Sequence, residues 1–166
     1  ITSDEDWTAP LPNADMVVSC LASRSGAPAD ARLVEYEANR RLLAYAERAA
    51  VQHFLLLSAI CVQIPRLAFQ REKLKFEALL AESSVPATII RATAFFRSLV
   101  GQVERVRVGK PFLLFSSGNL TACKPISDRD LARFMVSKLA LPPLSTSVLP
   151  IGGPGPCLLY TSPSPR

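Results

Sequence analysis

Phe69, Lys73 and Glu77 lie one helical turn apart in a segment that the sequence predicts to be helical over residues 67–82. This spacing places their side chains on one stripe of the helix. An ammonium there could bind a ligand at the carboxyl edge of a parallel sheet, whereas Phe69 has no proton to give. Plainer interpretations are a core Phe69 and a solvated Lys73. Glu77 could orient Lys73, or form with it an exposed salt bridge worth ~0.5 kcal/mol.

Two serines at the ends of predicted strands, Ser58 and Ser23, are expected to contact the same ligand. Ser58 lies near the end of the strand predicted over residues 54–60, with Ala59 beside it. The equivalent positions at the end of the strand predicted over 16–22 are Leu21, Ala22 and Ser23. Ligands of open parallel sheets bind outside the carboxyl ends of the strands. The competing interpretation is a strand-terminal Ser58 that bonds its own backbone.

Histidine and cysteine usage argues against two other chemistries. His53 is the single histidine, and it lies at the amino end of its predicted strand, away from the expected site. We therefore predict a structural or surface role for it rather than acid catalysis. None of the four cysteines forms a CxxC pair, so no metal site is expected.

The order of the predicted elements indicates an α/β fold. Apolar runs predict strands over 16–22, 54–60 and 85–91, with helices over 36–50 and 67–82 between them. Strands that alternate with helices at this spacing form parallel βαβ units. We expect a partial Rossmann-type doubly wound sheet whose first βαβ half is missing, because all seven glycines lie at or after Gly26 and none forms a GxGxxG turn. Asp15 opens the first strand, which we expect to be buried on both faces.

The later part of the chain has shorter predicted elements that do not alternate regularly. We predict a short helix over 94–100, strands over 111–116 and 122–125, and a final strand over 148–151. Ser127 is the expected N-cap of a helix that runs to Leu139, with Asp130 in a variant of the capping box. Residues 157–166 resemble translated adapter sequence and are left out of the fold.

Three regions follow as the expected domain organisation. Residues 1–100 form the second half of a nucleotide-binding domain, 101–156 a partial substrate-binding region, and 157–166 a non-native tail. The chain begins at Ile1, so we expect a truncated start that carries no information about targeting.

The net charge of +5 does not favour a nucleic-acid partner. The basic residues are scattered from Arg24 to Arg133 and are mixed with acids, which is typical of a solvated surface. No apolar run reaches the ~18 residues that a membrane-spanning helix needs. The composition fits a soluble globular domain.

The residues named above resemble a known family of reductases. Short-chain dehydrogenase/reductases place a Tyr-x-x-x-Lys pair where this chain has Phe69-Gln-Arg-Glu-Lys73. From about residue 14 to 155, the chain is similar to the divinyl chlorophyllide a 8-vinyl reductases, an atypical branch of that superfamily. The segments that carry the similarity are 17–24, 53–63, 69–77, 93–99, 101–104, 109–111, 123–127 and 149–155. Ala92 departs from the Arg-Pro-Thr usual in the family.

The resemblance implies an NADPH-dependent reduction of the 8-vinyl group of divinyl chlorophyllide or protochlorophyllide to ethyl, in the chloroplast. It implies that Lys73 holds the nicotinamide ribose. The cofactor contacts it implies are Leu21, Ala22, Ser23, Ser58, Ala59, Thr93, Ala94 and Phe95, and the substrate contacts are Phe69, Phe95 and Phe96. The expected partner is a tetrapyrrole, with peripheral association with plastid membranes as a further expectation and no nucleic acid. Core packing of the phenylalanines is the plainer alternative.

Two other function classes stay open. The first is a non-catalytic Rossmann regulator that senses the nicotinamide redox state, with which the loss of the tyrosine is compatible. The second is another atypical reductase, similar to isoflavone reductases, which also keeps the lysine without the tyrosine. Residues 123–127 and 94–96 argue against the second class.

Overall fold

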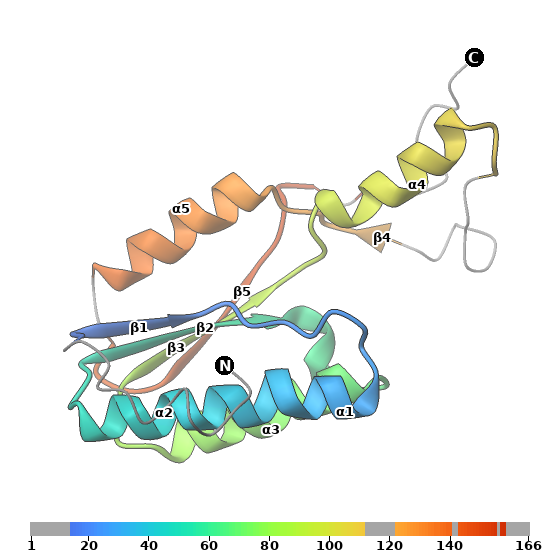
Figure 1. The fold of residues 1–166 in the computed structure, drawn as a ribbon. Coiled ribbons are helices and arrows are strands. Elements are labelled where there is room, and N and C mark those ends of the chain that lie inside the picture. The colour runs from blue at the N-terminus through green and yellow to red at the C-terminus, as the bar shows by residue number, and fades with distance from the viewer. Residues whose placement is uncertain (1–13, 112–121, 141–142, 156, 159–166) are drawn as a thin grey trace.

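A single parallel sheet organises the protein. The computed structural model describes residues 14–111, 122–140, 143–155 and 157–158. The strands are β1 (Met16–Ser19), β2 (His53–Ala59), β3 (Ala87–Ala92) and β5 (Ser147–Ile151), in the order β1-β2-β3-β5 (Figure 1). All three pairings are parallel. The predicted α/β class and parallel sheet are confirmed.

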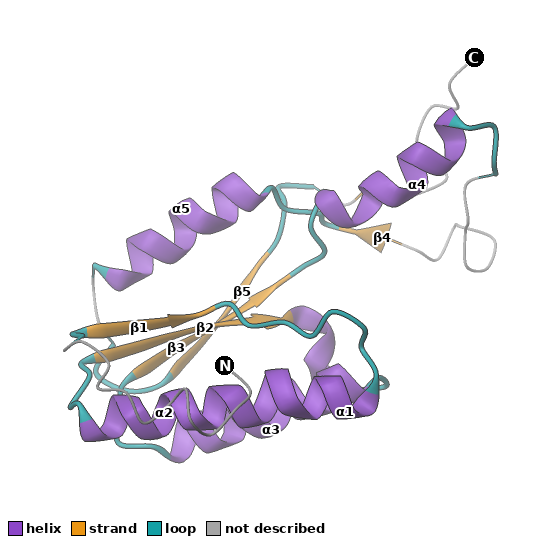
Figure 2. Ribbon diagram, viewed as in Figure 1, coloured by secondary structure: helices purple, strands orange, loops and turns teal. Residues whose placement is uncertain are grey.

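Helices cover both faces of this sheet, as a doubly wound fold requires. On one face lie α1 (Pro28–Ala31), the π-helical segment η2 (Arg32–Ala38), α2 (Asn39–Arg48) and α3 (Ala68–Glu82) (Figure 2). On the other face lies α5 (Asp128–Leu139). A 3-10 turn, η3 (Ile60–Gln63), follows β2.

The helix expected over residues 36–50 begins earlier than predicted. The segments α1, η2 and α2 follow one another without a break from Pro28 to Arg48. Pro28 suits a first helical turn, because its fixed φ is already helical and its missing N–H has no intrahelical partner there. Residues 28–35, which precede the predicted helix, are therefore helical as well.

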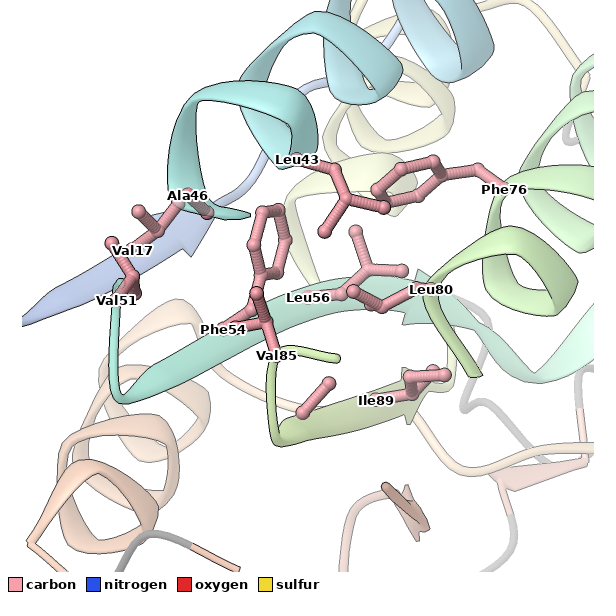
Figure 3. Close-up of a cluster of buried hydrophobic side chains, with 11 residues drawn as sticks. Val17, Leu43, Ala46, Val51, Phe54, Leu56, Phe76, Leu80, Val85 and Ile89 are labelled. Atoms are coloured by element: carbon pink, nitrogen blue, oxygen red, sulfur yellow. The ribbon is translucent and has the colours of Figure 1, made fainter. Parts of the chain in front are cut away.

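The larger apolar core lies between the sheet and the helices α2 and α3 (Figure 3). Phe54 of β2 and Phe76 of α3 are fully buried, with their ring centroids 6.0 Å apart. A second apolar cluster packs α5 against the opposite face through Leu131 and Met135. The two clusters therefore pack helices against opposite faces of the sheet.

The first strand is shorter and less buried than the sequence indicated. β1 ends at Ser19, and Met16 and Val18 are 40% and 46% exposed. The expectation of a strand buried on both faces is wrong, because β1 is an edge strand and α5 packs on β2 and β3. Only the face that carries Val17 and Ser19 meets helices.

The region after β3 only partly follows the expected boundaries. The helix predicted over residues 94–100 is α4 (Arg97–Arg107), which projects away from the sheet (Figure 1). The helix expected to start after Ser127 and to end at Leu139 is confirmed as α5. Because α5 packs on the sheet and β5 extends it, the boundary predicted at residue 100 does not follow the sheet. A substrate-binding role for residues 101–156 stays a prediction.

A small antiparallel ladder is separate from the parallel sheet. Its strands are β4 (Ala122–Cys123) and β6 (Cys157–Leu158). The strand predicted over residues 111–116 lies outside the described residues, apart from Pro111. The interpretation of 157–166 as a foreign tail stays a prediction. No helix within the described ranges is long and apolar enough to cross a membrane.

Candidate functional site

The carboxyl ends of the strands meet at one edge of the sheet. Ala59 pairs with Ala92, and Ala92 pairs in turn with Ile151. The segments that follow β1, β2 and β3 therefore begin at this edge. The structure brings to it the residues predicted to contact a cofactor, namely Leu21, Ala22, Ser23, Ser58, Ala59, Thr93, Ala94 and Phe95. Ala92 occupies the position of the family's proline and is held by β2 on one side and β5 on the other.

Lys73 reaches this edge from helix α3. Its side chain is only 11% exposed, and its Nζ lies 2.7 Å from Glu35 Oε2. Nζ also donates a hydrogen bond of 3.3 Å to the carbonyl oxygen of Leu21, in the loop after β1. The interpretation of Lys73 as a solvated surface lysine is therefore wrong. Its field also reaches Cys20, where burial raises the pKa of the thiol and the Lys73 ammonium opposes that rise.

Glu35 supplies a buried carboxylate to the site, and it was not identified from the sequence. It lies in η2 and is 2% exposed. Its Oε1 accepts hydrogen bonds of 2.9 Å from both the backbone N–H and the hydroxyl of Ser23. Its Oε2 faces Lys73. One carboxylate thus holds two of the residues that were predicted to contact a cofactor.

Asn39 is a second buried polar residue that the sequence analysis did not single out. Its Oδ1 accepts from Ser19 Oγ at 2.5 Å, and its Nδ2 donates to the carbonyl of Glu35 at 3.0 Å. A signal was present in the sequence. Glu35, Asn39 and Leu43 are spaced four residues apart, so their side chains lie on one face of the helix. Because Leu43 on that face is a core residue, the two polar residues were candidates for burial as well.

Glu77 has a different partner from the one that its spacing suggested. It is 4% exposed and forms an ion pair with Arg91 of β3, with Oε2 2.6 Å from Nη2. Both interpretations that paired Glu77 with Lys73 are therefore wrong, because Lys73 pairs with Glu35 and Glu77 pairs with Arg91 of β3. Ser58 is buried and donates to Glu77 Oε1 at 2.5 Å, so it bonds a carboxylate rather than its own backbone.

The segment after β3 places the aromatic residues. The Thr93 hydroxyl donates to the Lys124 carbonyl, and its N–H donates to the Ile151 carbonyl at 2.9 Å. Phe95 is half-buried and packs on the second core cluster, while Phe96 is 54% exposed. Phe69 is half-buried in the first turn of α3. Their roles as substrate contacts stay predictions.

His53 lies at the opposite end of β2, as predicted. It is fully buried, and its Nε2 lies 2.9 Å from Thr88 Oγ1. Burial lowers its pKa, which disfavours a charged imidazole. The structure places it in the core, away from the site. No group of three or more metal-binding side chains gathers among the described residues.

A buried lysine and acid at the carboxyl edge of a parallel sheet suit a nucleotide cofactor. A sequence profile described as NAD(P)H-binding matches residues 1–142, which is most of the chain. The chain belongs to this NAD(P)H-binding family. The expectation of a nicotinamide cofactor is thereby confirmed at the level of the family.

Curated relatives resemble this NAD(P)H-binding chain closely. It is 51% identical over 150 residues to the chloroplastic divinyl chlorophyllide a 8-vinyl-reductase of Arabidopsis thaliana, and 52% identical over 149 residues to that of Cucumis sativus. Each match covers 87% of this chain and 36% of the relative, so the chain spans about a third of the relatives' length. The resemblance found in the sequence is confirmed. The relatives are named chloroplastic, which bears out the expected chloroplast location.

Solved structures of low identity share the fold. A UDP-glucuronic acid 4-epimerase of Bacillus cereus in complex with NAD has a TM-score of 0.78 at 17% identity, covering 92% of this chain and 58% of the epimerase. MoeE5 in complex with UDP-glucose and NAD has a TM-score of 0.74 at 16% identity, covering 89% of this chain and 60% of MoeE5. These matches confirm the Rossmann-like fold and carry no further argument about chemistry.

Proposed function

We propose that the complete protein reduces the 8-vinyl group of divinyl chlorophyllide, or of its protochlorophyllide analogue, to an ethyl group with NADPH. Plant reductases named for this activity are about half identical to the chain, which supports the substrate class. The single structural observation that carries the proposal is the placement of the Lys73 ammonium at the carboxyl edge of the sheet, against the Leu21 carbonyl and Glu35.

The residues present fit a nicotinamide ribose. A lysine ammonium has three donors. Among the described residues, Lys73 forms an ion pair with Glu35 Oε2 and donates one hydrogen bond, to the Leu21 carbonyl. At least one donor therefore remains for a ribose hydroxyl. Ala22 is exposed and Ser23 half-buried in the same loop, so a cofactor could approach this loop from solvent.

The chemistry agrees with the absence of a phenol at Phe69. NADPH, when bound, supplies the hydride. A vinyl group has no oxygen to protonate, and its conjugation with the macrocycle spreads the charge that hydride addition leaves behind. A strong acid beside the reacting carbon is therefore unnecessary, and a proton from water or from another group completes the reduction. Phe69, Phe95 and Phe96 would contribute apolar wall, and positioning would supply most of the acceleration.

The test is the Lys73→Met variant of the complete protein. Lys73→Met removes the proposed ribose donor, so we expect the NADPH dissociation constant to rise at least about tenfold, equivalent to ~1.4 kcal/mol, together with a loss of pigment reduction. Fluorescence titration and chromatography of the pigments measure the two effects. Lys75→Met is the matched control, because Lys75 is an exposed neighbour on α3 that pairs with Glu72. Unchanged affinity and rate in Lys73→Met would refute the role of Lys73.

A redox-sensing regulator is the second candidate, and Phe69 is the observation that favours it. Such a protein would bind NADPH through Lys73 without any proton donor nearby. The two functions differ in turnover. If the wild-type protein binds NADPH but leaves divinyl chlorophyllide unchanged over many cofactor equivalents, the regulator is correct and the reductase is not.

A further inference from the structure

We propose that Glu35 is a positioning residue for the nicotinamide cofactor, acting through both Lys73 and Ser23. The inference rests on the proposed function, because it assumes that the loop after β1 and Lys73 meet the cofactor. It adds a residue that no sequence motif indicated. The carboxylate itself would not touch the cofactor, and it would set the geometry of two groups that do.

The contacts of Glu35 divide between its two oxygens. Oε2 lies 2.7 Å from Lys73 Nζ. Oε1 accepts from the backbone N–H and from the hydroxyl of Ser23, both at 2.9 Å. The side chains of Glu35 and Lys73 are 2% and 11% exposed, so water competes little for these bonds. A buried charge-assisted network of this kind holds its members more strongly than a surface pair does.

The network holds side chains from two different elements of the fold. Lys73 comes from α3, and Ser23 comes from the loop after β1. Because Lys73 also donates to the Leu21 carbonyl, the lysine and the loop are tied together twice. Glu35 thereby holds the Lys73 ammonium by an ion pair and holds the Ser23 hydroxyl as a donor toward itself. A cofactor would meet a lysine and a loop that are already ordered, which lowers the entropic cost of binding.

The backbone around Glu35 is itself held in place. Glu35 lies in the π-helical segment η2, and π-helical turns are often found at functional sites. Asn39 Nδ2 donates to the carbonyls of Glu35 and Val34, at 3.0 and 3.3 Å. Asn39 in turn accepts from Ser19 at the end of β1. The carboxylate is therefore anchored to the same strand end whose loop it organises.

The decisive experiment compares three variants of the complete protein. Glu35→Gln keeps an acceptor for Ser23 but removes the charge that holds Lys73. Glu35→Asp keeps the charge on a shorter side chain. Leu80→Ala is the destabilising control, because Leu80 is fully buried in the same helix as Lys73 and belongs to the apolar core, not to the predicted cofactor contacts. The measurements are the NADPH dissociation constant, the thermal unfolding midpoint and the rate at which an amine reagent labels Lys73 relative to Lys75.

We expect Glu35→Gln to raise the dissociation constant at least about tenfold, and Glu35→Asp to restore part of the affinity. Lys73 should be labelled faster in Glu35→Gln, because its ammonium has lost its buried partner. Leu80→Ala should lower the unfolding midpoint and leave the dissociation constant within about twofold. If Glu35→Gln lowers the midpoint as Leu80→Ala does, while it keeps wild-type affinity and wild-type Lys73 labelling, Glu35 is only structural and the proposal is overturned.

Two further outcomes separate this inference from its premises. If Glu35→Gln does not fold, Glu35→Asp decides: a dissociation constant raised at least about threefold supports the proposal, and an unchanged one overturns it. If wild-type protein binds NADPH and responds to Glu35→Gln as expected, but reduces no pigment, the proposed reductase fails while the positioning role of Glu35 stands.

Discussion

Two buried carboxylates on the same side of the sheet have different partners. Glu35 holds Lys73 and Ser23 at the carboxyl edge, while Glu77 holds Arg91 and Ser58 nearby. Each carboxylate satisfies one cation and one hydroxyl, so neither charge is left unpaired in the interior. The first pair lies at the edge where we propose that the cofactor binds, and the second joins helix α3 to strands β2 and β3.

Removing the second pair should destabilise the fold strongly. Glu77→Ala leaves Arg91 as a charge without its partner at a site where the arginine is 19% exposed. Loss of one member of a buried ion pair typically lowers the free energy of unfolding by about 3–5 kcal/mol. We expect a value in the lower part of this range, because Arg91 is partly exposed to solvent. Urea unfolding measures the change. Glu104→Ala, in an exposed pair with Arg107, should cost less than about 1 kcal/mol. Equal losses in the two variants would contradict the assignment.

His53 gives the protein a predictable response to acid. Burial lowers its folded pKa, and its Nδ1 has no hydrogen-bond partner among the described residues. The unfolded chain therefore takes up a proton more readily than the folded protein. The contribution of His53 to stability is present above its unfolded pKa of about 6.5 and is lost as the pH falls toward the lower folded value.

The corresponding measurement is the unfolding free energy between pH 8 and pH 5, roughly the range over which histidine titrates. The wild-type protein should lose stability across the lower part of this range. His53→Gln, which keeps a polar partner for Thr88, should show a flatter profile over the same interval. Parallel profiles for the two proteins would mean that His53 is not the group responsible.

At the scale of elements, the start of a helix was predicted well where a residue that commonly caps helices marked it. Ser127 accepts a hydrogen bond from the Asp130 backbone N–H at 3.0 Å, and α5 begins at Asp128. The start of the helical run from Pro28 to Arg48 was missed. The π-helical segment around Glu35 interrupts the 3.6-residue spacing by which a helix is recognised in a sequence. Tertiary contacts of Asn39, rather than local propensity, support that turn.

The cap of α5 supplies a test at this scale. Ser127→Ala should cost about 1 kcal/mol, because it leaves the Asp130 N–H without its acceptor at the helix start. Chemical denaturation measures the loss. Ser137→Ala is a suitable control, since its hydroxyl only donates back to the Phe134 carbonyl within the same helix. A larger loss in the control than in Ser127→Ala would contradict the capping role.

At the scale of the whole molecule, three distant segments meet beyond the carboxyl edge of the sheet. Lys124 accepts hydrogen bonds from the Thr93 hydroxyl and from the Gly153 N–H, the latter at 2.9 Å. Ile126 pairs with Phe95 in an isolated bridge. The segment that carries the predicted aromatic contacts is therefore fixed by the chain before α5 and by the chain after β5.

Glycine at residue 153 is what permits this junction. A Cβ there would overlap the Pro125 carbonyl oxygen, which is backbone and cannot move aside cheaply. We expect Gly153→Ala to cost about 1–3 kcal/mol and to displace the Thr93–Phe95 segment. Thermal unfolding and NADPH titration measure both effects. Gly155→Ala is the matched control, because no atom of the described residues lies within 4 Å of the Cβ that it adds. Similar losses in both variants would rule out the steric explanation.

The sequence alone determined the alternation of strands and helices, and with it the edge at which the strand ends and Lys73 meet. These features are local: apolar runs, helical spacing and a cap residue report directly on the elements they form. The parallel topology followed from the spacing of those elements, and the family from motifs spread along the chain.

Only the tertiary structure decided which charges pair and which faces are covered. Glu77 is one turn from Lys73, yet Lys73 pairs with Glu35 from another helix and Glu77 pairs with Arg91 from a strand. Likewise, β1 was expected to be buried on both faces, and its exposed Met16 and Val18 follow from where α5 packs. The physical reason is the same in each case. Ion pairing and burial depend on distances between segments far apart along the chain, and helical spacing measures only distances within one element.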